Sequence, residues 1–308
     1  MAASLVVPVG TQIVVRAAPD SDDLLAASSL GAVAEIITCP SDAQESYRAR
    51  LVDGAEVNLR REQFSILKQL KSGPLSTPDT AHDLDRYIIY RCVVGSQAYG
   101  LNREGSDVDR RGIYLPPAEF EWSIYGVPEQ LENPQTQECY WELKKFLVLA
   151  LKANPNILEC LFTPIVEHSS EIADVLLAKR HIFLSKLVYQ TYNGYVMSQF
   201  KRLEQDLRAT GELKWKHAMH LMRLLLQGIS VLNDSHVPVR VFQHRDALLA
   251  IRDGCQEWDE VNRWRLSLHR EFETAFQSTS LPDSPDYAEA NKLLVWARSK
   301  MTEVRHDS

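Results

Sequence analysis

Short runs of β-forming residues dominate the first part of the chain. They lie at residues 10–15, 31–37, 47–52 and 56–59. Asp53-Gly54, between the last two runs, is a strong hairpin turn. Four or five short strands within about 70 residues are typical of a small SH3-like or KOW-like barrel. We therefore predict an N-terminal β-barrel over residues 1–68.

The pattern changes over residues 69–86, where prolines, glycine and polar side chains indicate a linker. Apolar runs follow at 87–94 and 112–115, and a further strand and a helix are predicted at 135–139 and 140–153. These elements predict a mixed sheet with helices over residues 87–165.

Beyond residue 165, apolar residues recur at three- and four-residue spacing. The helices predicted from this spacing cover residues 171–178, 181–208, 213–233, 243–253, 257–277 and 285–303. Residues 166–308 therefore predict a helical domain. The fold class expected for the whole chain is α+β.

Composition narrows the classes of function. Of the 308 residues, 45% are hydrophobic and 24% charged, and the net charge is −7, which argues against a broad coat for nucleic acid. The five cysteines are scattered and form no CxxC pair, so neither a zinc ribbon nor a disulfide framework is predicted, and a cytoplasmic location is expected. No apolar stretch approaches the ~18 residues of a membrane span.

Two polar motifs follow the run at 87–94. Gly95-Ser96 comes directly after it, and Asp107 and Asp109 precede the run at 112–115. Alternate residues of a strand point to the same face, so the two carboxylates are expected to converge. Such hard oxygen ligands suit Mg²⁺ or Mn²⁺, and Gly95 allows a phosphate to approach the backbone closely while Ser96 donates to it.

The segment GSQAYGLNREGSDVDRRGIYLPP resembles the signature of the DNA polymerase β-type nucleotidyltransferase superfamily. A bacterial and phage branch with a later NPNxLExL segment, here residues 154–161, is the most similar, and the resemblance extends over roughly residues 87–300. It implies a mixed-sheet catalytic module that transfers a nucleoside monophosphate from a nucleoside triphosphate to a hydroxyl, with release of pyrophosphate. The acceptor stays open between an RNA 3′ end, a protein and a small molecule.

The resemblance also implies a third carboxylate on a neighbouring strand. Glu138 is our choice, although related sequences have an aspartate there, and Glu142 is the alternative. Glu159 is expected either to order the site from behind or to be an ordinary helix acid. Arg111 shares the strand parity of Asp107 and Asp109, so it is expected to face the metal and to bind a phosphate or hold the carboxylates.

A second candidate cluster lies in the helical region. Lys216, His220 and Arg223 fall at i, i+4 and i+7, on one helix face, and are predicted to bind the triphosphate. Two other functions stay open. The chain could be a catalytically weak nucleotide- or RNA-binding sensor, or an interaction protein that acts through its N-terminal barrel. The chain has neither a P-loop nor a GxGxxG motif.

Overall fold

The computed structural model describes residues 7–16, 31–40, 46–67, 83–133 and 135–302. The chain divides into two compact units, residues 1–78 and 79–308. In the described part of the chain, no helix is long and apolar enough to cross a membrane.

The first unit is an antiparallel sheet with the strand order β4-β3-β2-β1-β5. Its strands are β1 (Gln12–Val15), β2 (Val33–Thr38), β3 (Tyr47–Leu51), β4 (Glu56–Leu59) and β5 (Phe64–Ile66). One face buries a small apolar core that includes Ile13, Ile36, Tyr47 and Phe64. Among the described residues, no pairing of β4 with β5 closes the sheet, so the SH3-like barrel stays a prediction.

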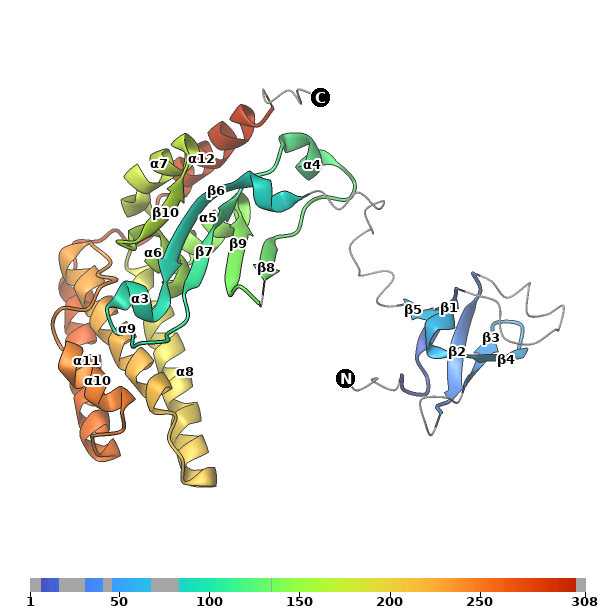
Figure 1. Ribbon diagram of the computed structural model, residues 1–308, viewed down its shortest axis with the longest axis horizontal. Helices are drawn as coiled ribbons and strands as arrows, with labels where there is room; N and C mark the ends of the chain where they lie inside the picture. Colours follow the sequence, from blue (N-terminus) through green and yellow to red (C-terminus); the bar gives the residue numbers. More distant parts are fainter. Residues whose placement is uncertain (1–6, 17–30, 41–45, 68–82, 134, 303–308) are drawn as a thin grey trace. The chain divides into compact units, whose positions relative to one another are not determined.

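The second unit is built on a mixed sheet with the strand order β10-β6-β7-β9-β8 (Figure 1). The strands are β6 (Ile88–Val94), β7 (Asp109–Tyr114), β8 (Gln130–Asn133), β9 (Glu138–Glu142) and β10 (Val166–Ser169). Only the pairing of β7 with β9 is parallel. β10 lies beyond residue 165 and pairs with β6, so a strand from the predicted helical region completes this sheet.

Helices pack against the sheet and against one another. They are α3 (Gly95–Tyr99), α4 (Ala118–Trp122), α5 (Leu143–Leu151), α6 (Pro155–Phe162), α7 (Glu171–Ala178), α8 (Leu187–Thr210), α9 (Trp215–Asp234), α10 (Arg245–Arg252), α11 (Trp258–Ser278) and α12 (Tyr287–Lys300). Asn154 caps α6, since its side chain accepts from the amides of Asn156 and Ile157, and Pro155 occupies the first turn, where no amide is needed.

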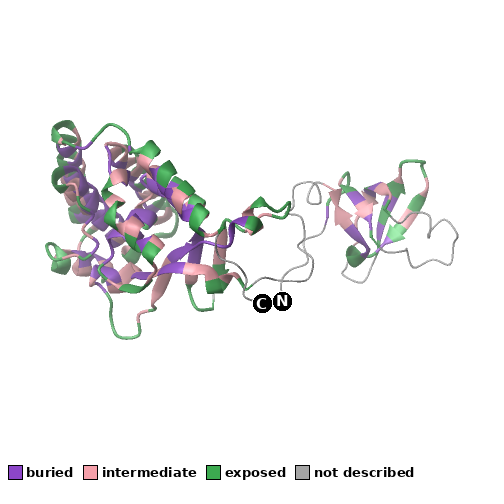
Figure 2. Cartoon of the chain, turned by 90° about the horizontal axis from the view of Figure 1, so that it is seen from above, coloured by how far each residue is buried: buried purple, intermediate pink, exposed green. Residues whose placement is uncertain are grey.

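The sheet and the helices of the second unit share one apolar core. It extends from Tyr90 and Ile113 on the sheet to Phe272 on α11 and Leu293 on α12. Figure 2 shows the buried positions gathered where the helices meet the sheet and one another. In the described part of the second unit, the sheet therefore has no apolar core separate from that of the helices.

Candidate active site

The glycine-serine turn and the second aspartate meet at one point. β6 ends at Val94, and Gly95 begins α3 with a φ of +70°, a conformation that favours glycine. A Cβ atom on Gly95 would overlap Oδ2 of Asp109. The Asp109 carboxylate thus lies against bare backbone, and both the torsion and the space require glycine at position 95.

Asp107 and Ser96 flank this contact. β7 begins at Asp109, so Asp107 lies in the preceding loop, exposed to solvent, and the alternation of a strand does not fix its direction. Ser96 lies in the first turn of α3, half-buried and next to Gly95. The structure therefore brings Gly95 against Asp109, with Ser96 next to Gly95 in the chain, and places Asp107 two residues upstream of Asp109 on an open loop.

Arg111 holds the Asp109 carboxylate. Its Nη2 atom lies 3.5 Å from Oδ1 of Asp109, on the same side of β7 as expected. Nη1 donates to the backbone carbonyl oxygens of Gln137, at 2.7 Å, and Arg110, at 2.8 Å. Arg111 thereby ties the start of β7 to the turn before β9. Its contact with Asp109 fits the predicted holding of a carboxylate, and its binding of a phosphate stays a prediction.

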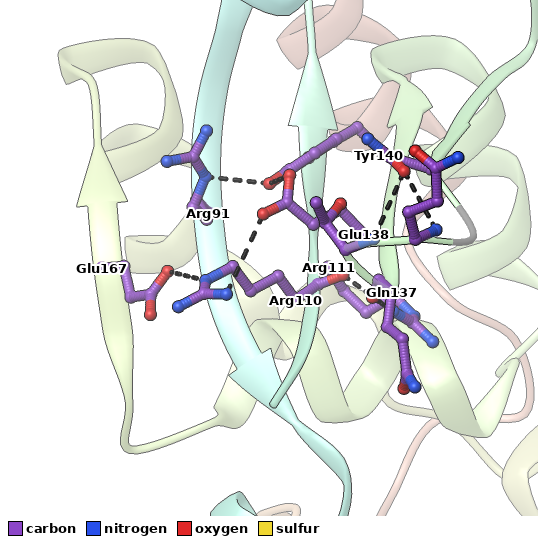
Figure 3. A network of polar contacts seen from close by, with 10 residues as sticks. Arg91, Arg110, Arg111, Gln137, Glu138, Tyr140 and Glu167 are labelled. Carbon is purple, nitrogen blue, oxygen red and sulfur yellow. Dashed lines mark hydrogen bonds and ion pairs between the residues drawn. The ribbon is translucent and has the colours of Figure 1, made fainter. Parts of the chain in front are cut away.

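Glu138 lies on the face of the sheet opposite to Asp109. Figure 3 shows it beside Arg110. The register pairs it with Arg110, and directly paired residues share a face, whereas Asp109 and Arg111 have the opposite parity. Glu138 Oε1 lies 4.0 Å from Arg110 Nη1, and Oε2 accepts from the Tyr140 hydroxyl at 3.1 Å. The predicted third carboxylate is therefore not brought to Asp109; it belongs to a network in which Arg110 also pairs with Glu167 at 2.9 Å.

A cysteine occupies the matching position on the face of Asp109. The register pairs Cys139 of β9 with Arg111. Burial raises the pKa of the Cys139 thiol to about 11, although the nearby Arg111 charge opposes the shift. At neutral pH this side chain is a protonated thiol, so β9 supplies no carboxylate to the face of Asp109.

Glu142, the alternative choice, has a structural role. It is buried at the start of α5, and its Oε2 accepts from the amides of Lys144, at 2.8 Å, and Lys145, at 3.3 Å. Its Oε1 accepts from Nη2 of Arg298 at 3.0 Å. Glu142 therefore caps a helix and anchors α12, with no contact to the aspartates.

Arg223, which was predicted to bind the triphosphate, is buried. Its Nη2 forms an ion pair with Glu159 at 2.7 Å, and both side chains are 2% exposed. Its guanidinium carbon lies 3.7 Å from the centre of the Tyr99 ring, and the Tyr99 hydroxyl donates to Glu159 at 2.6 Å. Burial opposes the charge of Arg223, but Glu159 beside it leaves the pKa of Arg223 raised overall. Arg223 thus anchors α3 and does not reach a triphosphate.

His220 and Lys216 have different environments. The Nδ1 atom of His220 lies 3.5 Å from Nη2 of Arg223. Burial and the Arg223 charge lower the pKa of His220 to about 3, so the ring is neutral at physiological pH. Lys216 is exposed in the first turn of α9. Of the three predicted triphosphate ligands, Lys216 is therefore the one whose charge is open to solvent.

Tyr99 was not singled out by sequence reasoning, and the partner of Glu159 was not identified. The sequence does contain a sign that Glu159 is buried with a partner. Within residues 157–162 of α6, Glu159 is the one charged residue, and the others are apolar or carry a thiol. A carboxylate in such a helix must be buried, and a buried carboxylate requires a cation or a donor. The partners come from distant parts of the chain, so the sequence did not identify them.

The position of Glu138 leads to a prediction for Glu138→Gln. We expect an almost unchanged kcat for nucleotidyl transfer and a loss of at most ~1 kcal/mol in stability, because a half-exposed ion pair contributes little. Steady-state kinetics and urea unfolding measure the two quantities. A loss of about 10²-fold in kcat would instead return Glu138 to a general-base role.

Comparisons with known proteins identify the family of this chain. Residues 68–296 match a family described as the RNA repair pathway DNA polymerase beta family, RlaP. The chain is also 31% identical over 142 residues to the uncharacterized protein YcgL of Bacillus subtilis (strain 168), an alignment covering 45% of this chain and 54% of YcgL. The chain thus spans about half the length of that curated relative, and no solved structure matches it. Because the family match covers well over half of its 308 residues, the chain belongs to the RNA repair pathway DNA polymerase beta family.

Proposed function

We propose that this protein is a metal-dependent nucleotidyltransferase that transfers a nucleoside monophosphate from a nucleoside triphosphate to a 3′ hydroxyl of RNA. The observation that best supports this proposal is the position of the Asp109 carboxylate against the backbone of Gly95. It would place a metal-binding acid beside a phosphate-binding turn. The description of the family as part of an RNA repair pathway favours RNA over a protein or a small molecule as the acceptor.

The residues present fit Mg²⁺ or Mn²⁺ bound together with a nucleotide. Asp107 and Asp109 would hold the ion, and carboxylate oxygens are the ligands that these hard cations prefer. Among the described residues, no group of three acid, histidine or cysteine side chains forms a complete metal site. Mg²⁺ commonly takes one or two carboxylates and completes its shell with phosphate oxygens and water. When bound, the metal would neutralise charge on the triphosphate and acidify the attacking hydroxyl.

The other residues of the site would bind and orient the nucleotide. The amide and hydroxyl of Ser96 would donate to phosphate oxygens beside the bare Gly95 backbone. Arg111 would keep Asp109 in place, and Lys216 would contact the triphosphate with its exposed ammonium group. In the reaction, a bond forms between the acceptor oxygen and the α-phosphorus while the bond to the β-phosphate oxygen breaks. Pyrophosphate leaves, and the hydroxyl proton passes to solvent.

A second candidate function is that of a nucleotide- or RNA-binding sensor with weak catalysis. The specific observation in its favour is Cys139, a protonated thiol where the neighbouring strand would otherwise place an acid on the face of Asp109. A site with two carboxylates would bind a metal-nucleotide complex but activate the attacking hydroxyl less well than a site with three.

One experiment separates these functions. The full-length protein is incubated with each α-labelled nucleoside triphosphate, Mg²⁺ or Mn²⁺, and an RNA that ends in a 3′ hydroxyl; the same RNA with a blocked 3′ end is the control. The proposed function predicts label transfer to the unblocked RNA with matching pyrophosphate release. Tight nucleotide binding without transfer would support the sensor, and neither binding nor transfer would refute both functions.

A further inference from the structure

The segment that joins α9 to α10 lies against the C-terminal end of α3, the helix that begins at Gly95. The amide of Val241 donates to the Tyr99 carbonyl at 3.0 Å, and Nε of Arg245 donates to the Gly100 carbonyl at 3.0 Å. A Cβ on Gly100 would lie 3.5 Å from Nε of Arg240. Residues 240–245 are therefore fixed to α3, whose first residue contacts Asp109.

This segment carries an exposed aromatic ring between two arginines. Phe242 is 80% exposed, and the guanidinium carbon of Arg240 lies 6.0 Å from its ring centre. Within the described part of the chain, no carboxylate lies within ion-pair distance of Arg240. Arg245 lies 3.7 Å from the carboxylate of Asp246, which is itself 99% exposed. An exposed ring beside arginines suits single-stranded nucleic acid, because a base stacks on the ring and the arginines attract phosphates.

The length of α3 sets the scale of the separation between residues 240–245 and Asp109. α3 has five residues, and at 1.5 Å per residue its two ends lie about 7 Å apart. Stacked nucleotides rise about 3.4 Å each along one strand, so about two nucleotides span this length. A strand whose 3′ hydroxyl lies at Asp109 would thus have a base near Phe242, two or three nucleotides upstream.

We propose that Arg240, Phe242 and Arg245 form an acceptor-strand surface, which binds the 3′-terminal nucleotides of a single-stranded nucleic acid beside the active site. Phe242 stacks on an upstream base, and the two arginines neutralise the phosphates on either side of it. The direction of the bound nucleic-acid strand, with its 3′ hydroxyl at Asp109, rests on the proposed function. Binding to the surface itself requires no catalysis, so the two are tested separately.

The test measures binding of a labelled 12-nucleotide single-stranded RNA by the full-length protein, by fluorescence anisotropy without nucleotide or metal. We expect Phe242→Ala to weaken binding of the RNA about 5- to 100-fold, which is the effect of losing one stacked base. Phe242→Trp keeps an aromatic ring at this position and is expected to bind as the wild type does. Arg240→Gln is expected to lower the slope of log K against log salt concentration by about 1. Trp122→Ala is the matched control, because Trp122 is 71% exposed on α4, at the opposite end of β7 from Asp109.

A single-stranded DNA of the same sequence is compared with the RNA. Weaker binding of both strands by Phe242→Ala supports the surface, and a preference for RNA would add a contact to the 2′ hydroxyl. Equal binding by wild type, Phe242→Ala and Trp122→Ala would overturn the surface, as would a wild-type protein that binds neither strand. Phe242-dependent binding by a wild-type protein that never transfers label would keep the surface and refute only the proposed function.

Discussion

Asp109→Asn is expected to abolish nucleotidyl transfer while the second unit keeps its fold. The amide has nearly the volume of the carboxylate, so the contact with Gly95 survives, but the charge that we propose to bind the metal-nucleotide complex is lost. The ion pair with Arg111 is 3.5 Å long and about one-third exposed, so its loss costs little stability. We expect kcat to fall at least about 10²-fold, as when one charge-stabilising group is removed from other active sites.

Kinetics, calorimetric titration of Mn²⁺ with nucleotide, and thermal unfolding check this result together. Asp234→Asn is the matched control, because it makes the same chemical change at the exposed end of α9. Retained transfer together with unchanged binding of metal and nucleotide would show that Asp109 is no metal ligand.

Glu159→Gln is expected to cause the largest loss of stability, about 3–5 kcal/mol, the cost of leaving one charge of a buried pair without its partner. Arg223 would keep its charge at 2% exposure, and its Nε and Nη1 atoms already have no hydrogen-bond partner among the described residues. The hydroxyl of Tyr99 would also lose the carboxylate to which it donates.

Urea unfolding followed by tryptophan fluorescence measures this loss. All six tryptophans lie between residues 122 and 296, so the signal reports the second unit alone. The double variant Glu159→Leu with Arg223→Met is expected to recover much of the stability, because it removes both charges. Tyr99→Phe is expected to cost ~1 kcal/mol, the net value of one hydrogen bond. Unfolding of Glu159→Gln at the wild-type urea concentration would contradict the structural role of the pair.

Local patterns predicted most of the helices and strands. The spacing of apolar residues placed helices at 213–233 and 257–277, and α9 and α11 occupy residues 215–234 and 258–278. The predicted helix over 140–153 was wrong at its start, because Tyr140 to Glu142 continue β9. A short apolar run suits a strand and a buried helix equally well, and here the pairing with β7 decided between them.

The candidate site was predictable where its residues are close in sequence. Gly95 and Asp109 lie within 15 residues and are in contact, whereas the expected convergence of Asp107 with Asp109 stays a prediction, because Asp107 lies in the loop before β7. The face of Glu138 depends on the register of β9 against β7, which no local pattern of residues 135–142 fixes. Tyr99 and Glu159, and then Glu159 and Arg223, are each separated by about 60 residues, so their contact follows only from the packing of α3, α6 and α9.

The attachment of α3 has a consequence for biosynthesis. Its end and the loop after it are held by Glu159 and by Arg245 and Arg252, which bond to carbonyl oxygens 145 and 151 positions earlier in the chain. These bonds cannot form until α10 has left the ribosome. A nascent chain that carries both sequence motifs therefore lacks most of the contacts that hold the turn in place. Contacts of such long range also slow folding, so the proposed nucleotide site is expected to form late, after α10 has been synthesised.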